Sequence, residues 1–299
     1  MTTVAYLVTS HTLPEQVLRL VRTIRELSPA SPVLVHHDPR RTRVDASPLG
    51  ATMVEPLPAV DWGRASQLDM LLRGLATALR SARFDWLTVL SGQDYPVRPL
   101  EAIERDLATT SYDGFVEGQL VEPPSWRRDG RDEFARRYFY AWTGVPEPGP
   151  LPRRAIAAAR PLVALRDLPS GPVLGRRART PFGPALPCRR GADWLTLSRR
   201  CVEIVDAAAR ERPGLHAYFR RTLIATEAYP HTVLHAHGGL RLSGDVRRFT
   251  AWEPGSAHPR VLRRSDLDAM LGSGADIARK FDATVDAGVL DELDRALRA

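Results

Sequence analysis

Short apolar runs and longer amphipathic segments alternate over the first hundred residues. Val4–Ser10, Pro32–His36 and Trp86–Leu90 are apolar, β-favouring and too short for helices, which is typical of buried strands. Between them, Pro14–Leu27 and Asp61–Ala82 repeat apolar residues at helical spacing. This alternation predicts an α/β fold with a doubly wound, mostly parallel sheet and right-handed crossovers.

The second half of the chain returns to the same alternation after an interruption at residues 121–187. The interruption is rich in Pro, Gly and Arg, with a candidate helix at Arg153–Leu165. We interpret it as a surface insertion, either a lid over a binding site or a poorly packed excursion. Further strands are predicted at Met53–Glu55, Asp113–Gly118, Ala192–Ser198 and Arg248–Trp252, and further helices at Pro99–Ala108, Arg199–Arg210, Tyr218–Leu223, Ser265–Leu271 and Asp286–Leu297.

Composition and charge narrow the class of protein. The 299 residues suit one large domain, and the net charge of +7 attracts polyanions such as nucleic acid, anionic membranes or phosphate-bearing ligands. Arginine supplies this charge almost entirely, because Lys280 is the one lysine in the sequence. Two cysteines, Cys188 and Cys201, imply no disulfide framework and suit a reducing compartment. We read neither a signal peptide nor a membrane-spanning run.

The stretch Phe84–Pro99 is the first candidate for chemistry. Its strand ends in Ser91-Gly92-Gln93-Asp94, a polar loop that presents the carboxylate of Asp94 where ligands bind in open α/β sheets. The sequence has no P-loop, no GxGxxG after the first strand and no HExxH. The trio His231, His235 and His237 could bind a metal, but its spacing does not place all three on one helical face. Asp266 and Asp268 are interpreted as favourable charge at a helix N-terminus.

Several separated stretches resemble the core-2/I-branching β-1,6-N-acetylglucosaminyltransferase family, which includes the peptide O-xylosyltransferases. They run in family order from about residue 4 to 282, nearly the whole chain, and are specific as a set. They are AYLVTSHTLPEQVLRLVRTI, VLVHHDPR, VDWGRASQLDMLLRGL with WLTVLSGQDYPVR, GADWLTLSRRCVEIV, TEAYPHTVL, RRFTAW and ADIARKFD.

The resemblance implies a GT-A-like glycosyltransferase that inverts the anomeric centre and works without a metal. The family's catalytic base is a Glu five residues before a Thr, a spacing that Glu227 and Thr232 keep. Thr226 stands where the family usually has Asp, a departure at the base motif. A positioned carboxylate can take the proton of an attacking sugar hydroxyl. The alternative for Glu227 is a helix-start carboxylate without chemistry.

The resemblance also implies a basic pair for the diphosphate of the leaving group. Fixed cations would stabilise the charge that grows there when no metal does so. Lys280 stands at the family's lysine position. The ungapped position of its partner is Ala257, so Arg260 and Arg279 are the candidates for the second cation. The alternative for Lys280 and Arg260 is that they are solvated surface cations.

Further residues are assigned from the resemblance to the nucleotide and the acceptor. Asp38 resembles the family residue that contacts the nucleotide, and His11 and Asp94 follow neighbouring strands. We expect Asp94 to shape the donor loop rather than to perform chemistry. Trp252 resembles an aromatic that packs on the acceptor sugar, with a core or rim tryptophan as the alternative. Glu117 is a candidate for binding acceptor hydroxyls.

Three functions remain open at this stage. The first is transfer of a sugar, foremost GlcNAc, from a UDP-sugar to a hydroxyl of a glycan, glycolipid or protein, with residues 1–120 as the nucleotide-sugar half and 188–299 as the acceptor and catalytic half. The second is transfer of xylose from UDP-xylose to a protein Ser, and the third is non-catalytic binding of a nucleotide sugar or polyanion. We expect no metal, no cofactor and no nucleic-acid partner. The chain resembles a bacterial cytoplasmic form that could touch the inner membrane face.

Overall fold

The computed structural model describes residues 2–124, 133–159, 162–256 and 258–298. A seven-stranded sheet forms the centre, in the order β13-β6-β12-β4-β1-β2-β3. In the described sheet β12 runs antiparallel to both its neighbours and the other pairs are parallel. These strands are β1 (Val4–Ser10), β2 (Val33–His37), β3 (Thr52–Met53), β4 (Trp86–Ser91), β6 (Gly114–Phe115), β12 (Thr196–Ser198) and β13 (Leu242–Ser243).

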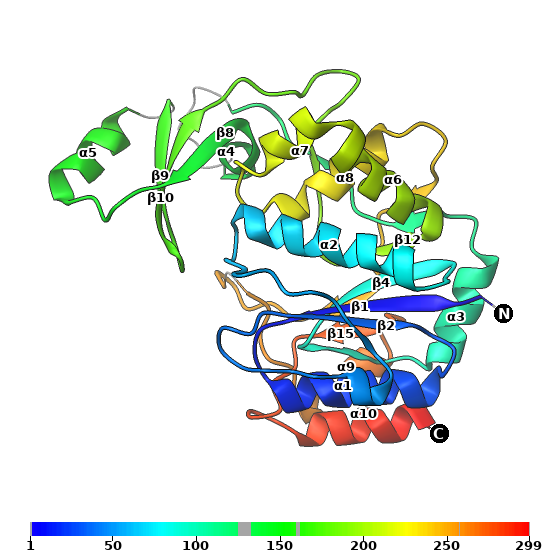
Figure 1. Ribbon diagram of the computed structural model, residues 1–299. Helices are drawn as coiled ribbons and strands as arrows, with labels where there is room; N and C mark the ends of the chain where they lie inside the picture. The colour runs from blue at the N-terminus through cyan, green and yellow to red at the C-terminus, as the bar shows by residue number, and fades with distance from the viewer. Residues whose placement is uncertain (1, 125–132, 160–161, 257, 299) are drawn as a thin grey trace.

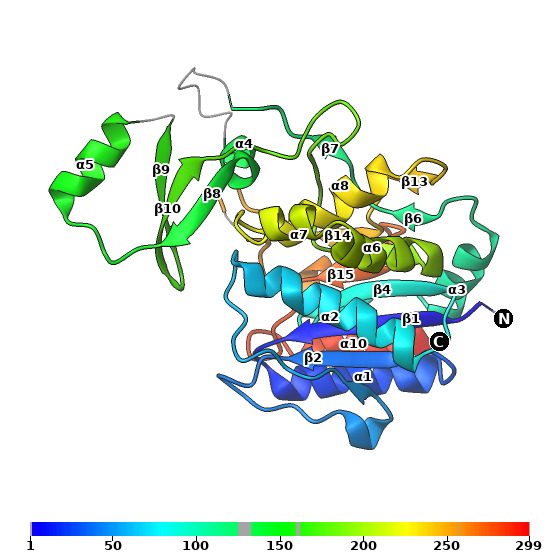
Figure 2. The ribbon, with the colours of Figure 1, turned by 45° about the horizontal axis from the view of Figure 1, so that its top comes forward.

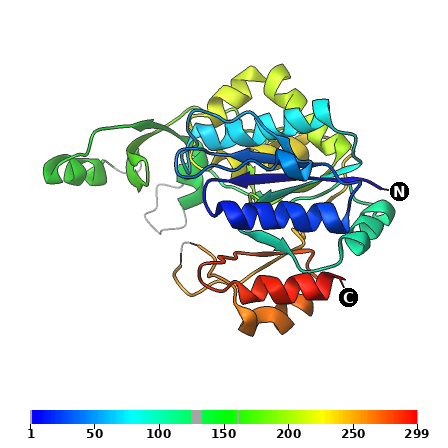
Figure 3. The same cartoon turned by 60° about the horizontal axis from the view of Figure 1, so that its bottom comes forward.

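Helices cover both faces of this sheet (Figure 1), which confirms the predicted doubly wound α/β architecture. Strand β1 shows why, because its alternate side chains enter two separate cores: Ala5 and Leu7 face one, and Tyr6 and Val8 face the other. One face carries α2 (Ala65–Ser81), α6 (Arg199–Glu211), α7 (Pro213–Phe219) and α8 (Tyr229–Ala236). The other carries α1 (Pro14–Leu27), α9 (Leu267–Leu271) and α10 (Gly288–Arg298), with α3 (Leu100–Thr109) at the end of the sheet (Figure 3).

A second, small sheet brings the end of the chain to the centre. It contains β14 (Arg248–Thr250), β15 (Ile277–Arg279) and β5 (Asp94–Pro96) in that order. The residues expected to form only a loop after Ser91 therefore start a strand, because they pair with β15 almost two hundred residues later. Two further short strands, β7 (Gln119–Leu120) and β11 (Arg189–Arg190), pair with each other.

The segment 133–187 is here called the arm, and its described outer helix and strands project from the body of the molecule (Figures 1 and 2). The arm contains α4 (Glu133–Phe139), β8 (Tyr140–Gly144), α5 (Pro150–Ala158), β9 (Val163–Leu168) and β10 (Gly171–Arg177). Its strands form an antiparallel sheet in the order β8-β10-β9. The predicted helix Arg153–Leu165 is wrong at its C-terminal end, because Val163–Leu165 belong to β9, where Leu165 pairs with Leu174 in β10.

Other element boundaries move where long-range contacts decide them. The predicted strand Ala192–Ser198 keeps only its last three residues, so that residues 191–195 form a loop. The predicted helix Tyr218–Leu223 is wrong beyond Phe219, where α7 ends. Ahead of α9, residues 264–266 form a 3₁₀ turn, and a further 3₁₀ turn contains Ala225–Glu227. In the described part of the chain no helix is both long and apolar enough to cross a membrane.

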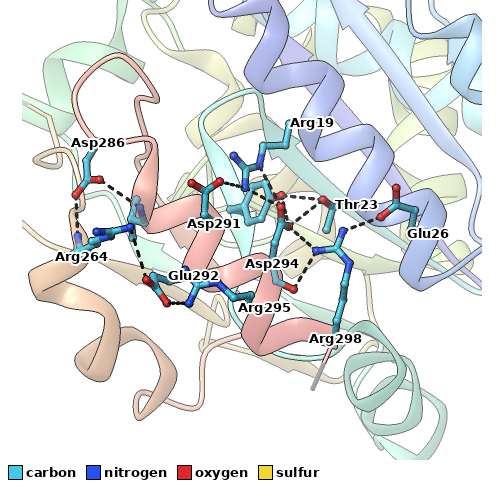
Figure 4. A network of polar contacts seen from close by, with 12 residues as sticks. Arg19, Thr23, Glu26, Arg264, Asp286, Asp291, Glu292, Asp294, Arg295 and Arg298 are labelled. Atoms are coloured by element: carbon cyan, nitrogen blue, oxygen red, sulfur yellow. Dashed lines mark hydrogen bonds and ion pairs between the residues drawn. The ribbon is translucent and has the colours of Figure 1, made fainter.

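The C-terminal helix is fixed to α1 by a polar network (Figure 4). Arg19 contacts Asp291 and Asp294, each with a 2.7 Å N–O distance. Asp294 also accepts a 2.7 Å hydrogen bond from the hydroxyl of Tyr95, which is fully buried. Arg298 reaches Glu26 at 2.7 Å. Because Tyr95 belongs to β5, this network joins both ends of the chain to the small sheet.

Candidate functional site

The carboxyl ends of β1, β2 and β4 meet at one edge of the central sheet. The N–H of Asp38 donates to the carbonyl of Ser10 at 2.8 Å, and that of Gly92 donates to the carbonyl of Thr9 at 2.9 Å. Position 92 has no room for a side chain, because a Cβ there would lie 2.7 Å from Val17 Cγ2. This edge is the crevice where ligands bind in open α/β sheets.

The three residues predicted to contact the nucleotide lie at this edge but differ in burial and in their partners. Asp38 is buried and is held by Arg40, whose Nη2 lies 2.7 Å from Asp38 Oδ2. Burial alone would raise the pKa of Asp38, but the hydrogen bonds from Arg40 bring it below the usual value, so this carboxylate is ionised. His11 is exposed, and partial desolvation together with Arg41 lowers its pKa.

Asp94, the last residue of the Ser91–Asp94 loop, is fully buried, and its side chain bonds back to the first residue of the loop. Its carboxylate accepts from the backbone N–H of Ser91 at 2.9 Å and from the Ser91 hydroxyl at 2.8 Å. Arg279 lies opposite in β15, with its Nε 3.5 Å from Asp94 Oδ1. The guanidinium of Arg279 also stacks on Trp194, 3.8 Å from the ring centre. With its oxygens occupied in this way, Asp94 can organise the loop but is not free to act as a base.

The structure places Lys280 directly beside the same loop. Lys280 follows β15 and is half-buried. The next residue, Phe281, donates its N–H to the carbonyl of Gln93 at 2.8 Å. Two stretches far apart in the sequence, Ser91–Asp94 and Arg279–Phe281, therefore form one wall.

Gln16 connects this wall to α1, and sequence reasoning missed it. Its Nε2 donates to the carbonyls of Gly92 at 2.9 Å and Phe281 at 3.2 Å, and its Oε1 accepts from the N–H of Ala283 at 2.8 Å. The side chain is buried. One signal was available, because Gln16 is a polar residue four positions before Leu20 on the inward face of the helix.

Arg260, the other candidate for the second cation at the diphosphate, is already paired with a carboxylate. The two Nη atoms of Arg260 contact the carboxylate of Asp266 at 2.8 and 2.5 Å. Ala257, the ungapped position for that cation, lies outside the described residues. Trp252 is 57% exposed and follows β14. Because β14 and β15 are parallel, with Thr250 opposite Arg279, Trp252 leaves its strand at the same end as Lys280.

A cluster of carboxylates forms the second part of the site. Glu227 ends the 3₁₀ turn before α8, and its Oε2 lies 2.9 Å from Arg137 Nη1 in the arm. The carbonyl of Glu227 accepts from the N–H of Gly191 at 2.9 Å, and Glu117 Oε2 accepts from the N–H of Ala192 at 2.7 Å. The 191–195 loop, which also carries Asp193, is thus held at both Glu227 and Glu117.

The electrostatics of this cluster suit proton transfer near neutral pH. Burial, and next the charge of Asp193, raise the pKa of Glu227 to about 7, although Arg137 opposes the shift. Burial also raises the pKa of Asp193, whose Oδ1 is buried without a hydrogen-bond partner among the described residues. Two close carboxylates with unfavourable solvation hold a proton between them more readily than either would alone.

Asp193 and Arg137 belong to the site, but neither was identified from the sequence. Asp193 was included in a predicted strand, although a charged residue inside the apolar run ADWLTL was a usable signal. Arg137 falls in the insertion, where no pattern indicated a role. The 191–195 loop also joins the carboxylate cluster to the wall beside Lys280, because Trp194, the residue after Asp193, stacks against the guanidinium of Arg279.

The histidines near this cluster support the backbone. His231 Nδ1 lies 2.7 Å from the carbonyl of Glu117, and its Nε2 lies 2.9 Å from the carbonyl of Ala192. Burial lowers the pKa of His231 to about 4. His235 also contacts the carbonyl of Glu117, at 3.1 Å. In the described residues no three His, Cys, Asp or Glu side chains are grouped so that they could hold a metal ion.

Comparison with known proteins identifies one family. The model of the Core-2/I-Branching enzyme family matches residues 4–140, just under half of the chain. No curated protein sequence matches the chain.

Two solved structures illustrate the structural matches. One is glucosyl-3-phosphoglycerate synthase from Mycobacterium tuberculosis with Mn²⁺, UDP and phosphoglyceric acid (16% identity, TM-score 0.32, 72% of this chain, 66% of that chain). The other is described as a glucose-1-phosphate thymidylyltransferase from Bacillus anthracis, with sucrose (7% identity, TM-score 0.30, 70% of this chain, 78% of that chain). The match thus spans just under two thirds of the synthase, and TM-scores this low carry no argument about this protein. Over residues 4–140 this chain is therefore similar to the Core-2/I-Branching enzyme family.

Proposed function

We propose that the protein is a GT-A-type glycosyltransferase that moves a sugar from a UDP-sugar, foremost UDP-GlcNAc, to an acceptor hydroxyl. One observation carries the proposal: Glu227, with a pKa raised to about 7, lies in a carboxylate cluster that Trp194 and Arg279 connect to the nucleotide-facing edge of the sheet. The match of residues 4–140 to the Core-2/I-Branching enzyme family supports the same reaction class.

Glu227 acts as the general base in this proposal. As the acceptor oxygen attacks the anomeric carbon, its proton passes to the carboxylate of Glu227, and a carbon–oxygen bond forms. The bond from that carbon to the diphosphate oxygen breaks, and its electron pair leaves with UDP. Attack from the face opposite the leaving group inverts the anomeric centre. A base whose pKa lies near the working pH is effective in both holding and releasing the proton.

Lys280 and Arg279 stabilise the departing diphosphate. Both belong to the wall beside the Ser91–Asp94 loop, and the Asp94 contact and the Trp194 ring fix the guanidinium of Arg279. Fixed cations need no reorganisation while negative charge grows on the leaving group. We therefore propose that the reaction proceeds without a divalent metal. Arg260 contributes less, because both its Nη atoms contact the carboxylate of Asp266 at 2.8 and 2.5 Å, whereas Arg279 approaches Asp94 only through Nε at 3.5 Å.

Glu227→Gln tests the assignment of the base. The amide keeps the shape of the side chain but cannot take a proton, so we expect UDP binding to persist while sugar transfer falls by about 10²–10⁴-fold. Glu101→Gln is the control, because the Glu101 side chain is 78% exposed on α3. Unchanged transfer in Glu227→Gln would remove Glu227 as the base.

A ligand titration tests the donor and the metal. We expect UDP and one UDP-sugar to stabilise the protein against heat, equally with and without EDTA, by about 2.7 kcal/mol at a hundred times the dissociation constant. Lys280→Ala should lose this response, and Arg295→Ala, 67% exposed on α10, should keep it. Selection of UDP-xylose would favour transfer to a protein Ser. A response that EDTA abolishes would contradict the metal-free mechanism, and no response to any nucleotide would favour polyanion binding.

A further inference from the structure

We propose that the arm is a docking surface for an anionic lipid bilayer. The body of the molecule is nearly neutral once the arm is set aside. Residues 133–187 carry nine arginines and three carboxylates, which is +6 of the chain's net charge of +7. Positive charge concentrated on one projecting element attracts an anionic surface and orients the protein on it.

The outermost helix of the arm, α5, exposes apolar side chains. The helix α5 lies far from the central sheet in Figure 1, and among its described residues no side chain is buried. Leu151 is 74% exposed, and Leu162, just beyond the helix, is 56% exposed. Leu151, Ala155 and Ala158 are separated by four and three residues, so they share one face of the helix. Figure 3 shows the same helix standing away from the body.

Basic side chains border these exposed leucines. Arg154 is exposed on α5, and Arg176 and Arg177 are exposed at the end of β10. The N–H of Arg177 donates to the carbonyl of Leu162 at 2.9 Å, which places the exposed leucine at the arginine-bearing end of the strand pair. Arg153 is engaged by Asp167 and Glu147, and the Arg177 side chain contacts the carbonyl of Pro124.

A lipid surface fits this combination better than a nucleic acid does. Leucines beside arginines can insert between acyl chains while the guanidinium groups remain among anionic headgroups. Single-stranded nucleic acids are instead held by exposed aromatic rings on which bases stack. In the arm Tyr138, Tyr140 and Trp142 are buried and contribute to the core.

Vesicle sedimentation with the full chain tests the proposal. We expect binding to phosphatidylglycerol-containing vesicles, with at least tenfold weaker binding to pure phosphatidylcholine and weaker binding at high salt. Leu151→Glu with Leu162→Glu should lower binding by about tenfold or more, since burying one leucine is worth a comparable factor. Leu271→Glu is the matched control, because Leu271 is 42% exposed on α9 in the body. UDP-induced thermal stabilisation should be equal in all three proteins.

A second variant separates the charge contribution from the apolar one. Arg154→Glu with Arg176→Glu should weaken binding to anionic vesicles and leave the weak binding to neutral vesicles unchanged. Equal vesicle binding by the parent and by both double variants would overturn the proposal. Binding of RNA or heparin without binding of vesicles would overturn it as well, and would make a soluble polyanion the occupant.

Discussion

At the scale of single residues, Glu227 and Asp193 carry the proton transfer that we propose for this site. Their carboxyl groups share a buried environment in which Arg137 supplies the nearest positive charge to Glu227. The pKa of Glu227 is raised above its unfolded value, so its favourable contribution to folding is complete below that value and is lost as pH rises through about 7. The deprotonated carboxylate, which the proposed base needs, is therefore the form of Glu227 that folding disfavours.

The pH dependence of kcat/KM should report this pair. A base must be deprotonated, so we expect kcat/KM to rise with pH through about 7. Asp193→Asn removes a negative neighbour of Glu227, so the rise in kcat/KM should move to lower pH. Arg137→Gln removes a positive neighbour, so the rise should move to higher pH. If Asp193→Asn abolishes turnover at every pH, Asp193 itself takes the proton.

At the scale of elements, Gln16 couples α1 to the wall that carries Lys280. Gln93 joins the Ser91–Asp94 loop to Phe281 through its carbonyl and its side-chain amide, and Gln16 donates to one carbonyl in each of these two segments. A buried carbonyl that loses its donor is destabilising by about 1–3 kcal/mol. We therefore propose that the Gln16 side chain positions Lys280.

Gln16→Leu should raise the KM for the UDP-sugar more than it lowers kcat. The substitution keeps the size of the side chain but removes the Gln16 donor of the Gly92 carbonyl, one of the two donors of the Phe281 carbonyl and the acceptor of the Ala283 N–H, so the wall should lose its fixed geometry. Steady-state kinetics with a parallel UDP titration would measure this, with Glu15→Leu, on the exposed side of α1, as the control. A loss of stability with unchanged UDP affinity would reduce Gln16 to a purely structural role.

At the scale of the whole molecule, the network of Figure 4 connects the two ends of the chain. Burial alone would raise the pKa of Asp294, but hydrogen bonds from Tyr95 and Arg19 hold it below the usual value. A depressed carboxylate pKa stabilises the folded state above the unfolded pKa, and that stabilisation is lost as pH falls. The same network anchors β5, which carries Asp94 into the site.

Asp294→Ala should lower the free energy of unfolding at pH 7 by about 1–3 kcal/mol, because it removes the acceptor of the buried Tyr95 hydroxyl and of Arg19. The deficit should shrink in acid, where the native carboxylate is protonated. Urea unfolding at several pH values would measure it. Asp291→Ala is the control, since its side chain is 56% exposed. An equal decrease in the free energy of unfolding in both variants would show that the buried Tyr95–Asp294 hydrogen bond adds no extra stability.

The sequence by itself determined the layers of the fold and indicated several segments of the candidate site. β1 and α1 begin and end where the apolar periodicity predicts, because that periodicity directly records which face of each element is buried. The motifs around Asp94, Glu227 and Lys280 also named segments that the structure brings to the same region. The residue roles, the metal-free mechanism and the cytoplasmic location remain predictions.

Only the tertiary structure revealed Asp193, Arg137 and Gln16 as parts of the site. Each acts through a neighbour distant in sequence: Arg137 reaches Glu227 across ninety residues, and Gln16 reaches Phe281 across 265. The arm shows the same limit, because the helix-favouring residues near Leu165 form a strand once β10 is available to pair. Local patterns record burial and backbone preference, whereas a pKa, a hydrogen bond between loops or a strand partner depends on which distant residues meet.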